Sequence, residues 1–235
     1  MLIHSLFDAL AWLAAAGIAW RIRRLGWLDA AIRVTPARNP GYFIALSLGA
    51  IAGAIAFGSL NLSLAGQSVL AHSIAGAIAG GIVAVELFKR ASGLSGSTGV
   101  SFVAPLALGI AIGRLGCFFA GLPDYTYGVP TTLPWGVDFG DGIPRHPVQL
   151  YESLSMLVFL SLFLTGVARH SRFMIQHGFY LFAGWYGAER FLWEFLKPYP
   201  SVIGPLNLFH LACLALVLYS AFMLRQNEYG LAPAR

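Results

Sequence analysis

The stretch GIAIGRLGCFFAGLPDY, residues 109–125, begins as apolar sequence and ends as a polar loop. Arg114 stands in the apolar part, where a charged side chain is costly if the segment crosses a bilayer. The whole chain has the composition of a membrane protein. Of its 235 residues, 57% are hydrophobic and 11% are charged, against roughly 25% charged residues in soluble domains. An arginine in such a segment indicates a functional site.

Seven apolar runs approach the roughly 20 residues that a membrane-spanning helix needs. They cover residues 4–20, 42–61, 67–88, 99–120, 147–168, 176–196 and 205–224. The first run is followed, not preceded, by arginines, so it does not have the pattern of a cleaved signal peptide. The sequence predicts an all-α integral membrane protein of about seven transmembrane helices. The chain is expected to form a single transmembrane domain over 1–235, with an outer loop at about 122–146.

Basic residues predict the orientation of these helices. Connections rich in basic residues alternate strictly with connections that have few. The basic residues follow the first, third, fifth and seventh apolar runs, and they are Arg21, Arg23, Arg24, Arg33 and Arg38; Lys89 and Arg90; Arg169 and Arg172; and Arg225 and Arg235. Because basic loops stay on the cytoplasmic side, the N-terminus is expected outside and the C-terminus in the cytoplasm.

This topology brings ionisable side chains from four helices to one depth. With a rise of about 1.5 Å per residue, Arg114 and Arg190 lie roughly 9 Å below the outer ends of their helices. On the same basis, His72 and Glu152 lie roughly 8 Å in from the outer surface. Two arginines and a histidine at one level require an anion. The phosphate of a phospholipid fits, because its oxygens match the guanidinium fork.

Further polar residues surround this level. Glu194 shares a helical face with Arg190, and Gln149 shares one with Glu152. Arg145 and His146 are expected just above, at the mouth of the site.

Structural interpretations exist for each of these residues. Arg114 could extend to the outer headgroups, and Arg190 could be neutralised by a neighbouring glutamate. His72 could be a hydrogen-bonded packing residue, and Glu152 a carboxylate that favours the start of a helix. The repeated string GAIAG, at 49–53 and 76–80, is interpreted as a pair of small-residue faces for helix packing.

Several classes of protein are excluded by what the sequence lacks. It has no nucleophilic-serine signature, no zinc-protease motif and no phosphate-binding loop. The net charge of +5 comes from scattered residues, so no nucleic-acid surface is expected. The two cysteines have no metal-ligand spacing, and no metal or other cofactor is expected. The protein should bind a phosphate and catalyse by acid–base chemistry, with the nucleophile on a second substrate.

Four stretches resemble the prolipoprotein diacylglyceryl transferase family. They are GRLGCFFAG at 113–121, RHPVQLYE at 145–152, GAERFLWEF at 187–195 and HSIAGAIAGG at 72–81. The resemblance implies transfer of the diacylglyceryl group of phosphatidylglycerol to the thiol of a lipobox cysteine in a precursor protein. A thioether forms and glycerol phosphate leaves. It also implies a multi-pass location in the bacterial cytoplasmic (inner) membrane.

The resemblance assigns roles to individual residues. His72, Arg114 and Arg190 are the implied catalytic residues. The resemblance also matches Gly128 to the glycine that closes the family signature. Together with the depth and helical-face arguments above, the predicted substrate-binding residues are Arg114, Gly116, Cys117, Gly128, Arg145, His146, Gln149, Tyr151, Glu152, Arg190 and Glu194. Three other functions stay open: an anionic-phospholipid binder or transporter without chemistry, a compact paralogue with another acceptor, and a structural partner in a membrane complex.

Cys117 occupies a position where the family commonly has asparagine. It follows Arg114 by three residues and shares roughly the same helical face. A thiol beside a guanidinium could be activated and carry a covalent lipid intermediate. Alternatively, Cys117 is a small apolar filler.

Overall fold

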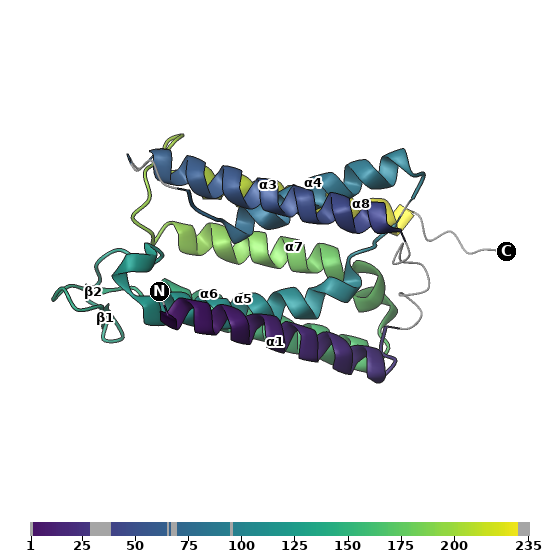
Figure 1. Ribbon diagram of the computed structural model, residues 1–235, viewed down its shortest axis with the longest axis horizontal. Coiled ribbons are helices and arrows are strands. Elements are labelled where there is room, and N and C mark those ends of the chain that lie inside the picture. The colour runs from purple at the N-terminus through teal and green to yellow at the C-terminus, as the bar shows by residue number, and fades with distance from the viewer. Residues whose placement is uncertain (1, 29–38, 65, 67–69, 95, 230–235) are drawn as a thin grey trace. The chain divides into compact units, whose positions relative to one another are not determined.

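The structure is a computed structural model of residues 1–235 (Figure 1). It describes every residue except 1, 29–38, 65, 67–69, 95 and 230–235. Three arginines of the topology argument, Arg33, Arg38 and Arg235, lie outside the described residues.

Seven long helices make up most of the described chain. They are α1 (Leu2–Arg24), α3 (Pro40–Leu64), α4 (Ile74–Ala91), α5 (Val100–Ala120), α6 (Val148–Ala168), α7 (Arg172–Glu194) and α8 (Leu208–Tyr229). Among the described residues, five of these helices (α1, α3, α5, α6 and α8) are long and apolar enough to cross a membrane. The predicted class, an all-α multi-pass membrane protein, is confirmed.

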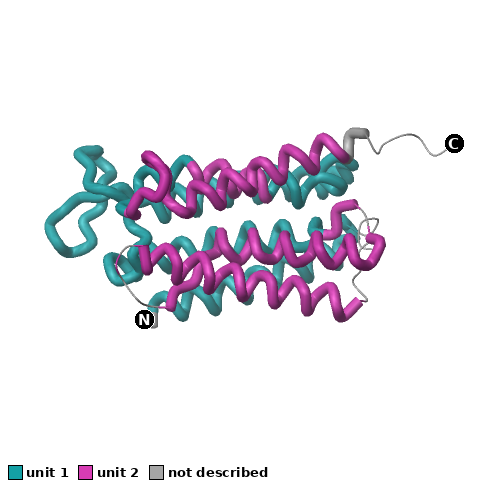
Figure 2. The backbone as a smooth tube through the Cα atoms, turned by 90° about the horizontal axis from the view of Figure 1, so that it is seen from above, with its two compact units in different colours: residues 1–33, 99–182, 192–198 teal, residues 34–98, 183–191, 199–235 magenta. Residues whose placement is uncertain are grey.

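Contacts group the described chain into two compact units, which Figure 2 colours separately. Unit 1 comprises residues 1–33, 99–182 and 192–198, and therefore α1, α5, α6 and most of α7. Unit 2 comprises residues 34–98, 183–191 and 199–235, and therefore α3, α4, α8 and the remaining part of α7.

In unit 1, α5 packs against both α1 and α6. A Cβ on Gly116 would lie 2.5 Å from the Cβ of Phe7, so glycine is needed for α1 to approach α5 here. The rings of Phe7 and Phe119 stack with centroids 5.4 Å apart. On the α6 side, the Ser153 hydroxyl donates a 2.8 Å hydrogen bond to the Ala111 carbonyl of α5.

A loop with a small hairpin joins α5 to α6. It contains the 3-10 turn η1 (Leu122–Asp124) and the antiparallel strands β1 (Val137–Asp138) and β2 (Pro144–Arg145). Asp138 organises the turn between the strands, because its Oδ1 accepts hydrogen bonds of 2.8–3.0 Å from the backbone N–H groups of Gly140, Asp141 and Gly142. The strands position Arg145 directly before the start of α6.

In unit 2, α3 and α4 are held together by glycine-to-glycine contact. A Cβ built on Gly53 or Gly76 would collide with the carbonyl oxygen of the other, and Gly49 and Gly80 form a second such pair. These four glycines are the ends of the two GAIAG strings. The interpretation of the repeat as packing faces is confirmed.

The expected helix over 67–88 is wrong at its beginning. Residues 67–69 lie outside the described residues, and 70–73 are not helical. Ser73 is the N-cap of α4, and its Oγ accepts a 3.1 Å hydrogen bond from the Gly76 N–H. His72 therefore lies outside the helix and is exposed, not one turn inside it. A serine that can satisfy a free N–H at a helix start is the signal that hydropathy alone did not register.

Gly53→Ala should destabilise the protein by about 1–3 kcal/mol, because the new methyl group meets the Gly76 carbonyl. Gly109→Ala on α5 is the matched control: its Cβ has no neighbour within 4 Å, so only the gain in helix propensity remains. Thermal unfolding of both variants in detergent measures the difference. Equal midpoints for the two variants would contradict the close α3–α4 contact.

Candidate functional site

Four buried charged side chains meet in unit 1. Arg114 of α5 lies 2.8 Å, through Nε, from Oε2 of Glu152 on α6. Lys197, just after α7, lies 2.7 Å, through Nζ, from Oε1 of the same carboxylate. Its Nζ is also 4.0 Å from Oε2 of Glu194. All four residues are 5% exposed or less. We call Arg114, Glu152, Glu194 and Lys197 the charge cluster.

The charge cluster is balanced, with two positive and two negative groups. Charges removed from water are tolerated only when they are paired and hydrogen-bonded. Glu152 pairs with two cations at once, since each of its oxygens lies beside a different one, and Lys197 donates a hydrogen bond to it. Its contact with Nε also sets the orientation of the Arg114 guanidinium. Glu152 is thus the carboxylate partner of Arg114 within the charge cluster.

Lys197 is the member of the charge cluster that sequence reasoning missed. In the sequence it is only a basic residue that follows the sixth apolar run. The local signal was its position three residues after Glu194, the spacing at which helical side chains become neighbours. Its contact with Glu152, which is 45 residues away in the chain, could not be read from spacing.

Gln149 lies one helical turn before Glu152 and is completely buried. Its Oε1 and Nε2 have no hydrogen-bond partner among the described residues. Leaving a buried amide unsatisfied costs about 1–3 kcal/mol. This side chain therefore has hydrogen-bonding groups that the described residues leave unused, and its role in substrate binding stays a prediction.

Arg145 at the mouth is already engaged by the protein. Its Nη1 and Nη2 form hydrogen bonds of 2.6 and 2.7 Å with the two carboxylate oxygens of Asp141, and its guanidinium lies 5.2 Å from the ring centroid of Tyr127. The hydrogen bond to Asp141 raises the pKa of Arg145, and the same bond lowers the pKa of Asp141. Arg145 thus fixes the hairpin at the entrance to α6.

Tyr151 contacts the side chains of Trp135 and His146 at the mouth of the site. Its hydroxyl accepts a 2.8 Å hydrogen bond from Trp135 Nε1 and lies 3.5 Å from Nδ1 of His146. Its ring lies 5.1 Å from that of Trp193. His146 and Tyr151, both predicted site residues, are therefore neighbours.

The two predicted glycines have protein neighbours where a side chain would be. Phe7 occupies the space beside Gly116. At Gly128, a Cβ would lie 2.5 Å from the His146 carbonyl oxygen, and the Gly128 N–H donates a 3.1 Å hydrogen bond to that oxygen. Both glycines permit close approach of the chain at the site.

Arg190 and His72 belong to unit 2. Arg190 is 4% exposed, and its guanidinium lies 5.4 Å from the ring centroid of Phe209 on α8. His72 is exposed, and the backbone at 71–72 is packed so closely on α3 that a Cβ on Gly58 would meet it. The predicted meeting of these two residues with Arg114 stays a prediction.

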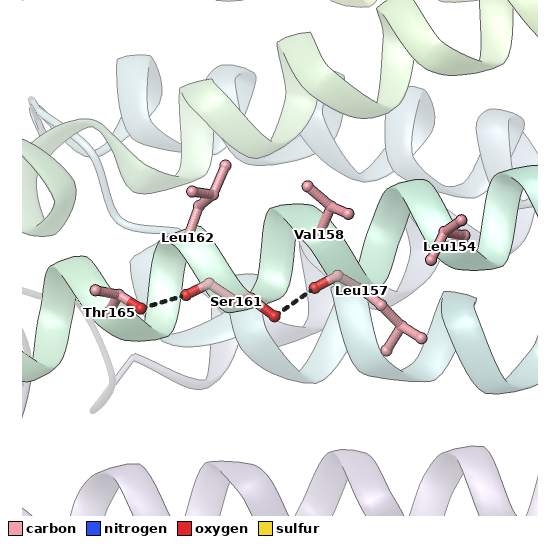
Figure 3. Close-up of a pocket in the computed structure, with 6 residues that line it drawn as sticks. All are labelled: Leu154, Leu157, Val158, Ser161, Leu162 and Thr165. Carbon is pink, nitrogen blue, oxygen red and sulfur yellow. Dashed lines mark hydrogen bonds between the residues drawn. The ribbon is translucent and has the colours of Figure 1, made fainter.

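A hollow of about 380 Å³ lies on α6, and no charged residue lines it (Figure 3). It is lined by Leu154, Leu157, Val158, Ser161, Leu162 and Thr165. The Ser161 and Thr165 hydroxyls each donate a 2.8 Å hydrogen bond to a carbonyl one turn earlier, so the hollow offers an apolar surface. It suits an acyl chain and has no group that could bind a phosphate.

A family model for prolipoprotein diacylglyceryl transferase matches residues 67–225. This range is more than half of the chain and includes α5, α6, α7 and the charge cluster. The chain therefore belongs to the prolipoprotein diacylglyceryl transferase family, as its motifs predicted.

Curated relatives named phosphatidylglycerol–prolipoprotein diacylglyceryl transferase are similar over part of their length. The protein of Nitratidesulfovibrio vulgaris strain DP4 is 36% identical over 164 residues, which are 65% of this chain and 60% of that protein. That of Bordetella parapertussis is 40% identical over 137 residues, 56% of this chain and 50% of that protein. The chain thus matches 50–60% of the length of these two relatives. No solved structure matches it.

The charge cluster can be tested by removing each side of the Glu152–Lys197 pair. Glu152→Gln leaves Arg114 and Lys197 without their shared carboxylate, so we expect a loss of about 3–5 kcal/mol in unfolding free energy. Lys197→Met should cost less, because Glu152 keeps Arg114. Unfolding of the single and double variants in detergent gives the coupling energy. Strictly additive losses would contradict the pairing.

The Asp141–Arg145 pair predicts a pH dependence of the hairpin. Because the folded pKa of Asp141 is lowered, the pair's stabilisation is fully present above the ordinary Asp pKa of about 3.9 and is lost as the pH falls through the lowered value. Carboxyl-carbon NMR of the labelled protein measures this titration. Arg145→Gln should return the pKa of Asp141 to its ordinary range, and an unchanged titration in that variant would refute the coupling.

Proposed function

We propose that this protein is a phosphatidylglycerol:prolipoprotein diacylglyceryl transferase. The lipobox cysteine sulfur attacks the glyceryl carbon that carries the phosphate ester. A carbon–sulfur bond forms, the carbon–oxygen bond breaks, and its electron pair leaves with glycerol phosphate. The thiol proton passes to a base. The protein supplies binding, positive charge and proton transfer, and both reacting groups belong to substrates.

The buried, oriented guanidinium of Arg114 is the observation that carries this proposal. Negative charge grows on the phosphate as the carbon–oxygen bond breaks, and a preorganised cation at low dielectric stabilises that charge strongly. Glu152 holds Nε of Arg114 in place, so the guanidinium need not reorganise during the reaction. Lys197 and Glu194 balance the cluster around it.

Arg190 is proposed as the second phosphate ligand, and His72 as the base that receives the thiol proton. Arg190 lies in the family motif GAERFLWEF. Like Arg114 it is buried, so its charge would interact strongly with a bound phosphate. The exposure of His72 leaves its imidazole accessible to an incoming thiol. Gln149 is proposed to hydrogen-bond a phosphate or glycerol oxygen of the lipid.

The proposal includes a topology and a location. The seven helices of a single transmembrane domain cross the bacterial cytoplasmic (inner) membrane, with the N-terminus outside. This arrangement places the charge cluster in the outer leaflet, where a secreted precursor could present its lipobox cysteine. The apolar hollow on α6 would then contact acyl chains.

Labelled phosphatidylglycerol and a lipobox peptide distinguish the candidate functions. With the full chain in liposomes, the transferase forms labelled thioether and releases glycerol phosphate in equal amounts, only when the peptide has its cysteine. Release of glycerol phosphate without a cysteine peptide indicates another acceptor. Lipid binding without release indicates a binder or transporter and rejects the transferase.

Arg114→Ala and Arg190→Ala should each lower the transfer rate by about 10²–10³, the usual effect of losing one group that stabilises developing charge. Arg169→Ala is the matched control, because Arg169 follows α6 and is exposed. The initial rate of thioether formation is the measurement. An unchanged rate in either site variant would refute the assignment of that arginine.

Gln149→Leu should raise KM for phosphatidylglycerol by about fivefold, because one ligand hydrogen bond is worth about 1 kcal/mol. The melting midpoint should not fall, since the amide has no described protein partner. A lower midpoint with unchanged KM would show that Gln149 serves folding alone.

A further inference from the structure

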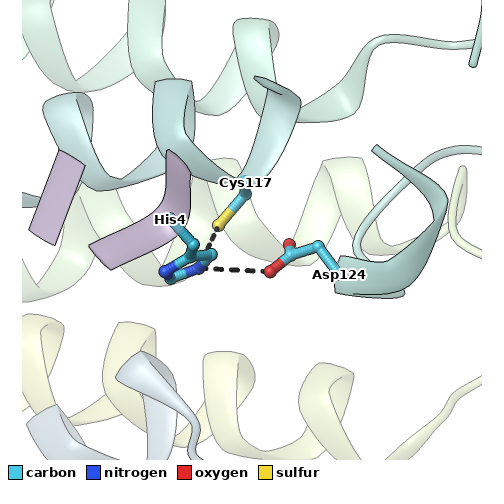
Figure 4. Close-up of side chains that lie close together, drawn as sticks. All are labelled: His4, Cys117 and Asp124. Carbon is cyan, nitrogen blue, oxygen red and sulfur yellow. Dashed lines mark hydrogen bonds and ion pairs between the residues drawn. The ribbon is translucent and has the colours of Figure 1, made fainter. Parts of the chain in front are cut away.

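Three metal-ligating side chains from separate elements of unit 1 converge near the end of α5 (Figure 4). They are His4 of α1, Cys117 of α5 and Asp124 of η1, and one potential ligand atom of each lies within 4.8 Å of the others. The Nε2 atom of His4 is 3.7 Å from the Cys117 sulfur and 3.2 Å from Oδ1 of Asp124. His4 and Cys117 are 113 residues apart, so no sequence spacing could reveal the group.

The distances fit ligands around one tetrahedral zinc ion. With zinc–nitrogen and zinc–oxygen bonds of about 2.0 Å and a zinc–sulfur bond of about 2.3 Å, tetrahedral angles separate nitrogen from sulfur by about 3.5 Å and nitrogen from oxygen by about 3.3 Å. The observed His4–Cys117 and His4–Asp124 separations differ from these values by about 0.2 Å and about 0.1 Å. Imidazole, thiolate and carboxylate are also the donor types that zinc prefers.

Outer contacts orient two of the three ligands. Oδ2 of Asp8 lies 2.9 Å from Nδ1 of His4, which places the Nδ1 proton on that side and turns the Nε2 lone pair toward the cluster. A carboxylate behind a histidine is the usual support of a zinc ligand. The Thr126 hydroxyl donates a hydrogen bond to Oδ2 of Asp124, so Oδ1 is the oxygen directed at the site.

Local packing explains why these residues meet. Phe7 fits against Gly116, and this contact brings His4, one helical turn earlier, beside Cys117. Gly121 then ends α5 with a φ of +69°, and the chain reverses through η1 to return Asp124. Gly116 thus makes room for α1 beside α5, and Gly121 allows the turn that follows α5.

We propose that His4, Cys117 and Asp124 bind a Zn²⁺ ion, with a fourth position open to water or a ligand. One cation between the three side chains would contact all three ligand atoms at once. Binding releases the thiol proton, and a neutral histidine with two anionic ligands balances the charge of the ion. The His4 side chain is 36% exposed, which gives the ion a path of entry.

This site does not depend on the transferase activity, and a metal-binding readout tests it. The full chain is purified in detergent without a polyhistidine tag, stripped with a chelator, and titrated with Zn²⁺ or Co²⁺. We expect one metal per chain, a thiolate-to-cobalt charge-transfer band and the strong visible bands of tetrahedral Co²⁺. Failure to bind a metal in the micromolar range would overturn the proposal and indicate a hydrogen-bonded network instead.

Single variants distinguish the three proposed zinc ligands from residues that do not bind the metal. Cys117→Ser should remove the charge-transfer band, and Asp124→Asn should weaken Zn²⁺ binding by 10-fold or more. Asp8→Asn should weaken it by about 10–100-fold and keep the band, as expected for a residue behind a ligand. Cys213→Ser and His170→Gln are matched controls outside the site and should behave as the unchanged chain. A charge-transfer band that persists in Cys117→Ser but disappears in Cys213→Ser would refute the assignment.

Circular dichroism of each stripped variant establishes that it is folded. Zn²⁺ should also raise the melting midpoint of the unchanged chain, because the metal binds the folded state. An equal rise in Cys117→Ser and Asp124→Asn would assign the effect to another site and overturn the proposal.

Discussion

The ion pairs of Glu152 are the constraint on which unit 1 depends. A fully buried carboxylate is tolerable only if cations accompany it, and Glu152 is flanked by Arg114 of α5 and Lys197 after α7. Three parts of the chain are thereby joined at one buried point. The same pairing that stabilises the fold also orients Arg114, so the structural requirement and the proposed phosphate chemistry act on one side chain.

Close backbone approach is the second constraint, and glycine supplies it in both units. The paired glycines of α3 and α4 remove the side chains that would otherwise separate these helices. Gly116 does the same for α1 and α5, and Gly128 for the loop before α6. In a bilayer, where apolar burial between helices gives little driving force, such contacts contribute much of the association energy. Their effect on function is indirect, because they determine which polar side chains become neighbours.

Cys117 illustrates how the surroundings change the interpretation of one residue. Beside Arg114 in the sequence, it suggested either an activated thiol or an apolar filler. In the structure its sulfur faces His4 and lies in a group with Asp124, so the filler interpretation does not account for its polar contacts. The proposed zinc site and the charge cluster lie on the same helix, with Arg114 and Cys117 three residues apart. A metal there would anchor the start of α1 near the proposed catalytic groups.

Hydropathy and motif spacing determined the class of this protein, its helices and its family, because helix length, charge exclusion and short motifs are local properties of the sequence. They also identified Arg114, Glu152 and Gln149 as polar groups in apolar surroundings. The local rules failed at His72, where the Ser73 cap starts α4 later than hydropathy predicted. Only tertiary structure could pair Lys197 with Glu152, or bring His4 to Cys117, because both contacts join distant parts of the chain and depend on how helices pack.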